Sequence, residues 1–369
     1  MHKTTDLKNV ALIEFGKSHS ECLHTQIYFM AKAGYCVHLI CDSVVWSQIE
    51  EKEKLAGSMS VEIKRGFFQS LLVVFKARRY MRKHRITHLV VNTIENAIIR
   101  ILFLLPFFRK VNCTGLVHES KKFASGHSFR RIIRHRVKKF FVLSEYIKNT
   151  TQDVAAKGKY EVEFFYPLYF PALNDISLVK KNDGEFWITI PGLVELHRRD
   201  YSGLLKAIRR EPLHPSVKLI LLGNYTPENF PEFQQLLNEA GTESKQLVMF
   251  GADFISNDVF HSYIRRSDLI LPLMFPIDGN QSIYGEHKIS GAFNLSFAYK
   301  IPLLLEESMK NLEDFKGCSF YYKANNLVST INSFVNRQQE IEAMRRNMAA
   351  DPRYNLEQQM QRYVNFVQL

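Results

Sequence analysis

Short apolar runs that suit β-strands alternate with longer segments of helical spacing along almost the whole chain. The first repeat is clear, because the apolar run Val10–Phe15 is followed by helical spacing over Glu21–Lys32 and by a second apolar run, Val37–Cys41. Strands that alternate with helices form parallel sheets covered by helices on both faces. With 46% apolar residues, the chain is predicted to be an α/β protein, and disordered, collagen-like and disulfide-scaffold chains are excluded.

A change of composition divides the chain into two parts. Residues 166–185 are rich in Pro, Asn, Asp and Lys and have the composition of a linker. A length of 369 residues also favours two domains. We predict a doubly wound Rossmann-like domain over 1–170, a linker over 171–185, a second such domain over 186–350, and a C-terminal helix over 351–369 that packs back on the first domain. Two such domains are expected to face a central cleft.

Three further elements are predicted from the same patterns. Strands are expected at Val61–Ile63 and Leu269–Leu273, and one long closing helix at Ser329–Asn347.

Polar residues follow the predicted strands of the second half. Strand Trp187–Ile190 runs into Gly192, which is followed by the cationic pair Arg198 and Arg199, and the next strand stops at Gly223 and Asn224. Further on, Glu286 and Lys288 precede a helix that begins near Ser290 and Gly291 and carries Asn294. A helix start with small residues offers N–H groups and a partial positive charge, which suit a diphosphate.

These motifs, in this order, resemble those of the GT-B-fold glycosyltransferases, in particular the retaining family 4 group. The matching residues are Gly192 with Arg198, Gly223, Asp268 with Pro272, and Glu286 followed by Asn294 and Pro302. The resemblance implies a GT-B fold and transfer of a sugar from a nucleotide-diphospho-sugar of the UDP or GDP type, with retention and without a cofactor. Two departures are Leu193, where the family often has Arg, and Asn294, where it has a second Glu.

The resemblance also implies roles for individual residues. Glu286 is expected near the transferred sugar and is a candidate catalytic residue. The candidate donor-binding residues are Gly192, Arg198, Arg199, Gly223, Asn224, Lys288, Ser290, Gly291 and Asn294. Fixed cations and helix-start N–H groups stabilise the charge that develops on a diphosphate leaving group, so no metal is expected. Asp268 is expected to orient a strand rather than to act in catalysis.

Two loops of the first half follow predicted strands. The loop Gly16, Lys17, Ser18, His19 opens a helix, and in GT-B enzymes this loop faces the acceptor side of the cleft. It lacks the GxGxxG pattern of dinucleotide sites. His118 follows strand Cys113–Val117 and matches a family His that borders the donor sugar, so it is the second candidate catalytic residue.

The positive charge of the chain is concentrated in its first half. Residues 1–170 hold 28 Lys and Arg against 14 Asp and Glu, a net charge of +14, while the remainder is close to neutral. Most of the excess lies in Lys76–Arg85 and Arg130–Lys139, the latter with the spacing of a basic amphipathic helix. These segments predict an anionic membrane surface as partner; a solvated cationic face is the alternative. Nucleic acid is not expected, because no helix-turn-helix or stacking motif accompanies the charge.

The N-terminus lacks the apolar core of a signal peptide, so a cytoplasmic protein, peripheral on the inner face of the cell membrane, is expected. The predicted activity is glycosyl transfer to a glycan or lipid-linked acceptor in cell-surface polysaccharide synthesis, such as capsule or O-antigen assembly. Two alternatives share the architecture: a catalytically silent GT-B partner subunit, and a nucleotide-sugar 2-epimerase.

Overall fold

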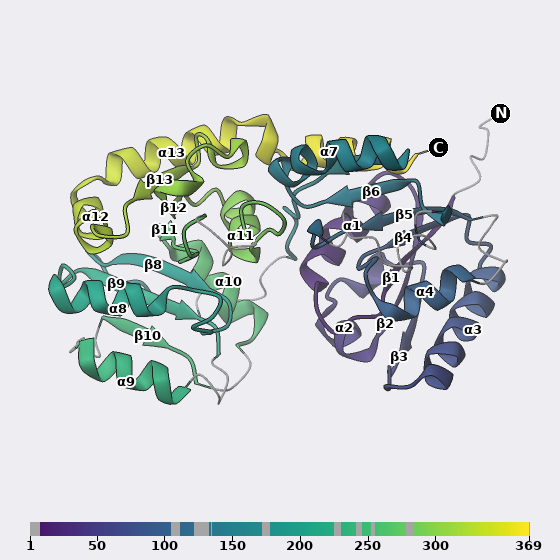
Figure 1. The fold of residues 1–369 in the computed structure, drawn as a ribbon, viewed down its shortest axis with the longest axis horizontal. Coiled ribbons are helices and arrows are strands. Elements are labelled where there is room, and N and C mark those ends of the chain that lie inside the picture. The colour runs from purple at the N-terminus through teal and green to yellow at the C-terminus, as the bar shows by residue number, and fades with distance from the viewer. Residues whose placement is uncertain are drawn as a thin grey trace. The chain divides into compact units, whose positions relative to one another are not determined.

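The computed structural model forms two compact units (Figure 1). The first unit comprises Met1–Pro171 together with Leu356–Leu369, and the second comprises Ala172–Asn355. The residues that the structure describes are 8–104, 111–121, 133, 135–171, 178–224, 230–240, 246–251, 255–277 and 284–368.

The first unit is built on a parallel sheet whose described strands run in the order β3-β2-β1-β4-β5-β6-β7. Its strands are β1 (Asn9–Glu14), β2 (Cys36–Asp42), β3 (Gly57–Val61), β4 (His88–Val91), β5 (Asn112–Leu116), β6 (Lys139–Val142) and β7 (Glu161–Phe164). Its helices are α1 (Ser20–Lys32), α2 (Ser43–Gln48), α3 (Phe67–Lys83), α4 (Ala97–Leu104), α7 (Glu145–Gly158) and α14 (Leu356–Val367). The central strand β1 is buried on both faces, as an apolar strand between two helical layers must be.

The last helix belongs to the first unit. In α14, the ring of Tyr363 stacks on Phe141 with centroids 4.6 Å apart, and the Tyr363 hydroxyl donates to Oε1 of Gln26 in α1. The side chain of Gln359 accepts a hydrogen bond from the backbone N–H of Tyr166. The chain thus returns to the first unit after completing the second.

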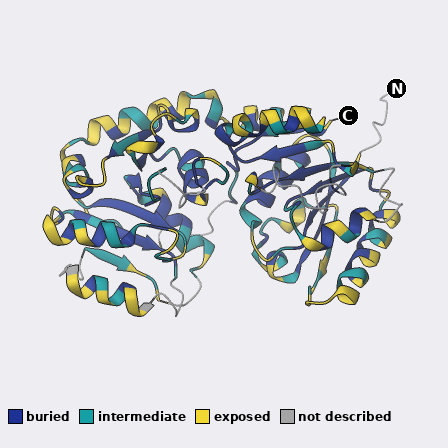
Figure 2. Cartoon of the chain, in the orientation of Figure 1, coloured by how far each residue is buried: buried dark blue, intermediate teal, exposed yellow. Residues whose placement is uncertain are grey.

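The second unit repeats the design with the strand order β10-β9-β8-β11-β12-β13 among its described residues. Its strands are β8 (Phe186–Pro191), β9 (Val217–Leu222), β10 (Leu247–Met249), β11 (Leu269–Ile270), β12 (Leu303–Glu306) and β13 (Ser319–Tyr322). Its helices are α8 (Tyr201–Arg210), α9 (Phe230–Ala240), α10 (Asn257–Arg266), α11 (Gly291–Tyr299), α12 (Leu327–Ser333) and α13 (Gln338–Ala350). Figure 2 shows that the central strands of the sheets are buried and that the outer faces of the helices are exposed.

In each sheet the strand order reverses once. The chain winds outward from β1 through β2 and β3 and then restarts on the other side of β1 with β4; the same happens at β8 and β11. The loops that follow the two central strands therefore diverge, which leaves a crevice at their carboxyl ends. This topology selects the loops after β1 and β4, and after β8 and β11, as candidate sites.

Three predicted elements differ from the structure. Strand β3 spans Gly57–Val61, and its pairing with β2 stops where the backbone N–H of Ile63 donates to the side-chain carboxylate of Asp42, the last residue of β2. Strand β11 ends at Ile270; Pro272 has no N–H to offer, and Leu273 has a left-handed φ of 55°.

The predicted closing helix is two helices, α12 and α13, which are separated at Phe334–Asn336 by a short 3-10 turn. The guanidinium of Arg337 lies 4.5 Å from the centre of the Phe334 ring and bonds Glu340, which fixes this break. No helix among the described residues is both long enough and apolar enough to cross a membrane.

Candidate functional site

Two glycine turns meet at the carboxyl edge of the second sheet. Gly192, after β8, has a φ of 102°, which favours glycine, and its N–H donates to the carbonyl of Leu222. Gly223, after β9, lies so close that a Cβ placed there would be 2.2 Å from the carbonyl oxygen of Gly192. The N–H of Val194 bonds the carbonyl of Asn224 and joins the two loops again. Both glycines are therefore required by the close approach of these loops.

The neighbouring arginines Arg198 and Arg199 have different roles. Arg199 is 9% exposed, and its terminal nitrogens donate to the carbonyls of Pro191, at the end of β8, and Pro272, after β11. It therefore holds the diverging strand ends together and does not face solvent. Arg198 is half-exposed; it donates to the hydroxyl of Tyr284 and pairs with Glu195. Of the predicted pair, Arg198 is the cation placed at the surface of the site.

Tyr284 belongs to the segment that leads into α11. Residues Tyr284 and Lys288 form an isolated β-bridge, so the segment folds back on itself, and the Lys288 ammonium lies 5.8 Å from the Tyr284 ring centre. Ser290 caps α11 by accepting a hydrogen bond from the N–H of Ala292. A Cβ at Gly291 would meet nothing within 4 Å among the residues that the structure describes, so they leave the helix start open. Arg198 and Lys288 thus both lie against Tyr284, and Lys288 precedes the cap of α11 by two residues; we refer to Arg198, Lys288 and the N-terminus of α11 as the cationic cradle.

The remaining predicted donor residues flank this cradle. The Glu286 side chain is 54% exposed and lies 3.6 Å from His287. Asn294, one turn into α11, is only 2% exposed, and its Oδ1 has no hydrogen-bond partner among the described residues. Leaving a buried acceptor unsatisfied costs about 1–3 kcal/mol. Asn294, a predicted donor-binding residue, is therefore buried in the second unit.

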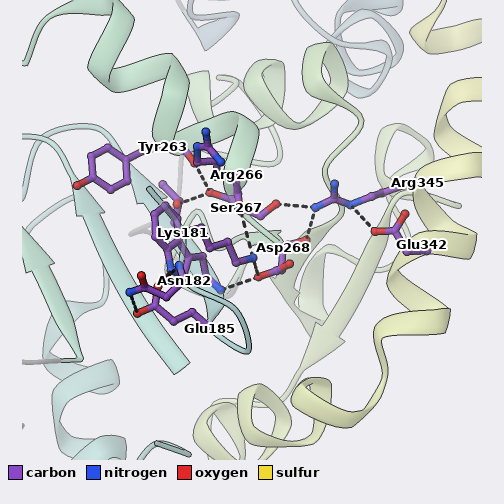
Figure 3. Close-up of polar contacts among 11 residues, drawn as sticks. Lys181, Asn182, Glu185, Tyr263, Arg266, Ser267, Asp268, Glu342 and Arg345 are labelled. Atoms are coloured by element: carbon purple, nitrogen blue, oxygen red, sulfur yellow. Dashed lines mark hydrogen bonds and ion pairs between the residues drawn. The ribbon is translucent and has the colours of Figure 1, made fainter. Parts of the chain in front are cut away.

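Asp268 lies at the opposite edge of the sheet. It precedes β11, and its carboxylate accepts bonds from Lys181 and from the backbone N–H of Trp187, near the start of β8 (Figure 3). Arg345 of α13 donates to the carbonyl of Ser267 in the same cluster (Figure 3). Asp268 therefore fixes the amino ends of two strands, which agrees with the orienting role expected from the sequence.

Replacing Asp268 by Ala is expected to destabilise the second unit by about 1–3 kcal/mol, because Lys181 and the Trp187 N–H lose a partly buried acceptor. Nucleotide affinity should not change, because the cradle lies at the other edge of the sheet. Urea unfolding and nucleotide titration measure the two quantities. The exposed pair of Lys316 and Glu313 provides a control, since Lys316→Ala should cost less than about 1 kcal/mol.

The crevice of the first unit is built around Glu14, the last residue of β1. This carboxylate is fully buried and accepts hydrogen bonds from the N–H of Gly16, the amide of Asn92 and the hydroxyl of Thr93. Burial raises the pKa of Glu14, although these three hydrogen bonds act in the opposite direction. Asn92 also donates to the carbonyl of His19 and so ties the loop after β1 to the end of β4. Glu14 therefore fixes the path of the Gly16–His19 loop.

Two histidines stack at this loop. The rings of His19 and His118 are 3.8 Å apart, and His19 has a left-handed φ of 71°. His118 Nε2 lies 2.7 Å from the carbonyl of Asn92; a carbonyl only accepts, so Nε2 carries the proton. The structure thus brings together the two histidines that the sequence singled out. Lys17 and Ser18 are exposed on the same loop.

The charge of His19 depends on its carboxylate neighbours. Burial alone would lower its pKa, but the hydrogen bond to Glu21 and the charges of Glu21, Glu14 and Glu95 outweigh burial and raise it. Protonation of His19 therefore favours the folded state below pH 6.5, and this contribution is lost as the pH rises through the raised pKa. NMR titration of the ring should place its pKa above 6.5.

Replacing Glu21 by Gln should lower the pKa of His19, since it removes the hydrogen-bonded charge. His38 is the control, because its pKa is lowered by burial and by His84, and Glu21 is not among these causes. An unchanged His19 titration in Glu21→Gln would contradict the assignment.

Several site residues were not predicted. Glu14, Asn92, Thr93 and Tyr284 are all polar residues at or just after the carboxyl end of a strand, or in the segment before α11. Their position in the sequence could have identified the residues at strand ends. A polar residue that directly ends an apolar strand, next to the reversal of strand order, is a candidate site residue. Among the described residues, no group of three or more His, Cys, Asp or Glu is placed to hold a metal ion.

The two basic segments are described to different extents. Lys76–Arg85 lies on the last turns of α3 and the residues that follow. Arg130–Lys139 lies in part outside the described residues, so its predicted amphipathic helix is not among the described elements.

Comparison with known proteins relates the fold to solved structures. No protein-family model matches the sequence, and no curated protein matches it. HepE from Anabaena, solved in complex with UDP, is similar with a TM-score of 0.66 and 14% identity over 97% of this chain and 99% of that one. A glycosyltransferase from Rickettsia africae is similar with a TM-score of 0.68 and 12% identity, covering 98% of each chain.

The UDP-GlcNAc 2-epimerase of Methanocaldococcus jannaschii is also similar, with a TM-score of 0.58 and 12% identity over 90% of this chain and 92% of that one. These likenesses cover at least 90% of this chain and so span both units. The predicted fold class is confirmed: the chain has the GT-B fold, with two Rossmann-like α/β domains that each contain a parallel sheet.

Proposed function

We propose that the protein is a glycosyltransferase that moves a sugar from a nucleotide-diphospho-sugar to a glycan or lipid-linked acceptor in cell-surface polysaccharide synthesis. The observation that carries the proposal is the cationic cradle of Arg198, Lys288 and the α11 N-terminus at the strand-order reversal of the second sheet. Open α/β sheets bind ligands at this position, and helix N-termini bind phosphate groups.

Each group of the cradle has a role in the proposed reaction. As the glycosidic bond to the diphosphate breaks, negative charge grows on the leaving oxygen, and Arg198, Lys288 and the N–H groups at Ser290–Gly291 stabilise it. The glycine turns at Gly192 and Gly223 let the nucleotide approach the backbone. Glu286 contacts the donor sugar, and His118 borders the reacting centre. The transfer is of the retaining type and needs no metal for charge neutralisation.

The buried Asn294 fits a role in binding the ribose. Its unsatisfied Oδ1 gains a hydrogen-bond donor if a ribose hydroxyl reaches it. Nucleotide binding would then remove the free-energy penalty of the unsatisfied acceptor in the unbound protein. UDP is the first nucleotide to test, because HepE was solved with UDP.

The experiment is calorimetric titration of the full chain with UDP and GDP, repeated on Gly291→Ala. A Cβ at Gly291 meets no atom of the described part of the chain and suits a helix, so stability should be unchanged or higher. If the diphosphate lies against this helix start, the added methyl should weaken binding about tenfold. Gly251→Ala, whose Cβ also meets no described residue within 4 Å, is the control and should bind like the unaltered protein. Absence of binding to both nucleotides overturns the proposal.

A nucleotide-sugar 2-epimerase is the second candidate, because two such enzymes are among the similar structures. An epimerase converts its UDP-sugar with no acceptor present, whereas a transferase releases UDP slowly unless an acceptor is added. Product analysis of UDP-sugars incubated without acceptor separates the two. A silent partner subunit would give neither product.

A further inference from the structure

Helix α3 of the first unit exposes large apolar side chains to solvent. Phe67, Phe68, Leu72 and Phe75 are 64%, 80%, 53% and 50% exposed. A fifth, Leu104, is 60% exposed at the end of α4, the helix that packs beside α3. The described residues include only a few other exposed large apolar side chains, and none of these lies on α3 or α4. Exposed apolar patches of this kind mark interaction surfaces.

The exposure follows from the helical pattern of α3. Val73, Val74, Ala77 and Met81 form the face that packs on the unit and are buried. On the opposite face, Phe68, Leu72 and Phe75 are spaced at i, i+4 and i+7, and Arg79 and Lys83 continue the same stripe. The outward face of one helix is therefore apolar in its first half and cationic in its second half, where a surface helix would ordinarily be polar throughout.

The charge around this face has one sign. No Asp or Glu lies between Glu62 and Glu95. In that interval the sequence has eight cationic residues, Lys64, Arg65, Lys76, Arg78, Arg79, Arg82, Lys83 and Arg85. Cations therefore flank the apolar side chains at both ends of the helix. A partner must accept apolar side chains in its interior and present negative charge at its surface, and an anionic bilayer does both.

We propose that α3 is an interfacial anchor that lies flat on an anionic bilayer, with Phe68, Leu72 and Phe75 inserted among the acyl chains and the flanking cations on lipid phosphates. The sequence predicts an anionic membrane partner for Lys76–Arg85 and for Arg130–Lys139; the exposed apolar half of the α3 face is what the structure adds. This anchoring requires no nucleotide sugar, so it stands or fails independently of the proposed activity.

The test is flotation of the full chain with vesicles of 30 mol% phosphatidylglycerol in phosphatidylcholine, compared with phosphatidylcholine alone. The triple variant Phe68→Gln, Leu72→Gln, Phe75→Gln should partition at least tenfold more weakly into the anionic vesicles. The double variant Arg79→Glu, Lys83→Glu should lose the preference for anionic lipid. All five side chains are exposed, so these variants should unfold at nearly the same temperature as the unaltered protein.

Matched controls lie in the second unit. Lys206→Glu, Arg210→Glu reverses two exposed cations at the same i, i+4 spacing on α8, and Leu178→Gln replaces an exposed apolar side chain elsewhere. Both controls should bind vesicles like the unaltered protein, and every variant should titrate UDP alike.

The proposal is overturned if the unaltered protein does not float, if it floats equally with neutral vesicles, or if the α3 variants bind as well as the controls. It is also overturned if the apolar variant turns a dimer into a monomer while vesicle binding is absent, since the face would then join two copies of the chain.

Discussion

Replacing Gly223 by Ala is expected to destabilise the second unit by about 2–3 kcal/mol and to weaken nucleotide binding in the same variant. The added Cβ would lie 2.2 Å from the carbonyl oxygen of Gly192 and 2.9 Å from the backbone nitrogen of Leu193. Both are backbone atoms, so no side chain can rotate away and the two loops must separate. Insertion of a methyl group into a packed contact costs about 1–3 kcal/mol, and here the backbone itself must shift.

Gly251 provides the matched control for this prediction. It also follows a strand, β10, but a Cβ there meets nothing within 4 Å among the described residues, so Gly251→Ala should change stability by less than about 0.5 kcal/mol. Urea unfolding measures both variants, and UDP titration shows whether the separated loops still form the site. Equal stability of the two variants would mean that the glycine turns do not need their close contact.

The fold could be predicted because each strand and helix carries its own pattern. The predicted strands Val10–Phe15 and Val37–Cys41 and the predicted helix Glu21–Lys32 agree with β1, β2 and α1 to within one residue at each end. The errors at the ends of β3 and β11 occur where a residue distant in sequence contacts the strand end. The end of β3 depends on the carboxylate of Asp42. The end of β11 lies near the carbonyl of Pro272, which accepts a hydrogen bond from Arg199. The break between α12 and α13 contains no Gly or Pro and depends on the packing of Arg337 on Phe334.

The candidate site could be predicted in its positions but not in its contacts. Arg198 and Arg199 are identical in type and adjacent in sequence, yet one faces Tyr284 and the other is buried between two strand ends. Local sequence does not distinguish them, because Arg199 donates to the carbonyls of Pro191 and Pro272, which follow two different parts of the sheet in the sequence. Similarly, the sequence predicts only that Glu14 lies near the end of an apolar strand. Its contacts with Asn92 and Thr93 follow from the order of strands in the sheet.

The first unit shows how such contacts extend from the core to the loops. Tyr363 of α14 bonds Gln26, Gln26 bonds Asn92, and Asn92 bonds Glu14. A chain of hydrogen bonds therefore runs from the last helix of the sequence to the loop that carries His19. Because each member is buried, an incomplete chain would leave unsatisfied polar groups. The C-terminal helix thus supports the candidate site as well as the core.

Replacing Arg198 by Ala is expected to lower kcat/KM for sugar transfer by about 10²- to 10³-fold, the range found when one charge-stabilising donor is removed from an active site. Arg198 reaches from the loop after β8 to the segment before α11, so its charge lies beside the proposed diphosphate position. UDP affinity should fall less than kcat/KM, because the charge on the leaving group is greatest in the transition state. Stability should change by less than about 1 kcal/mol, since the side chain is 44% exposed.

Two variants separate the charge of Arg198 from its placement. Tyr284→Phe removes the hydroxyl that Arg198 contacts but keeps the cation, so a loss of about tenfold or less is expected. Arg209→Ala removes an exposed cation of α8 and should leave transfer unchanged. Steady-state kinetics with the donor identified by titration measures all three variants. If Arg198→Ala retained full kcat/KM while Arg209→Ala did not, the cradle would be misassigned, and the charge that stabilises the leaving group would have to come from another part of the second unit.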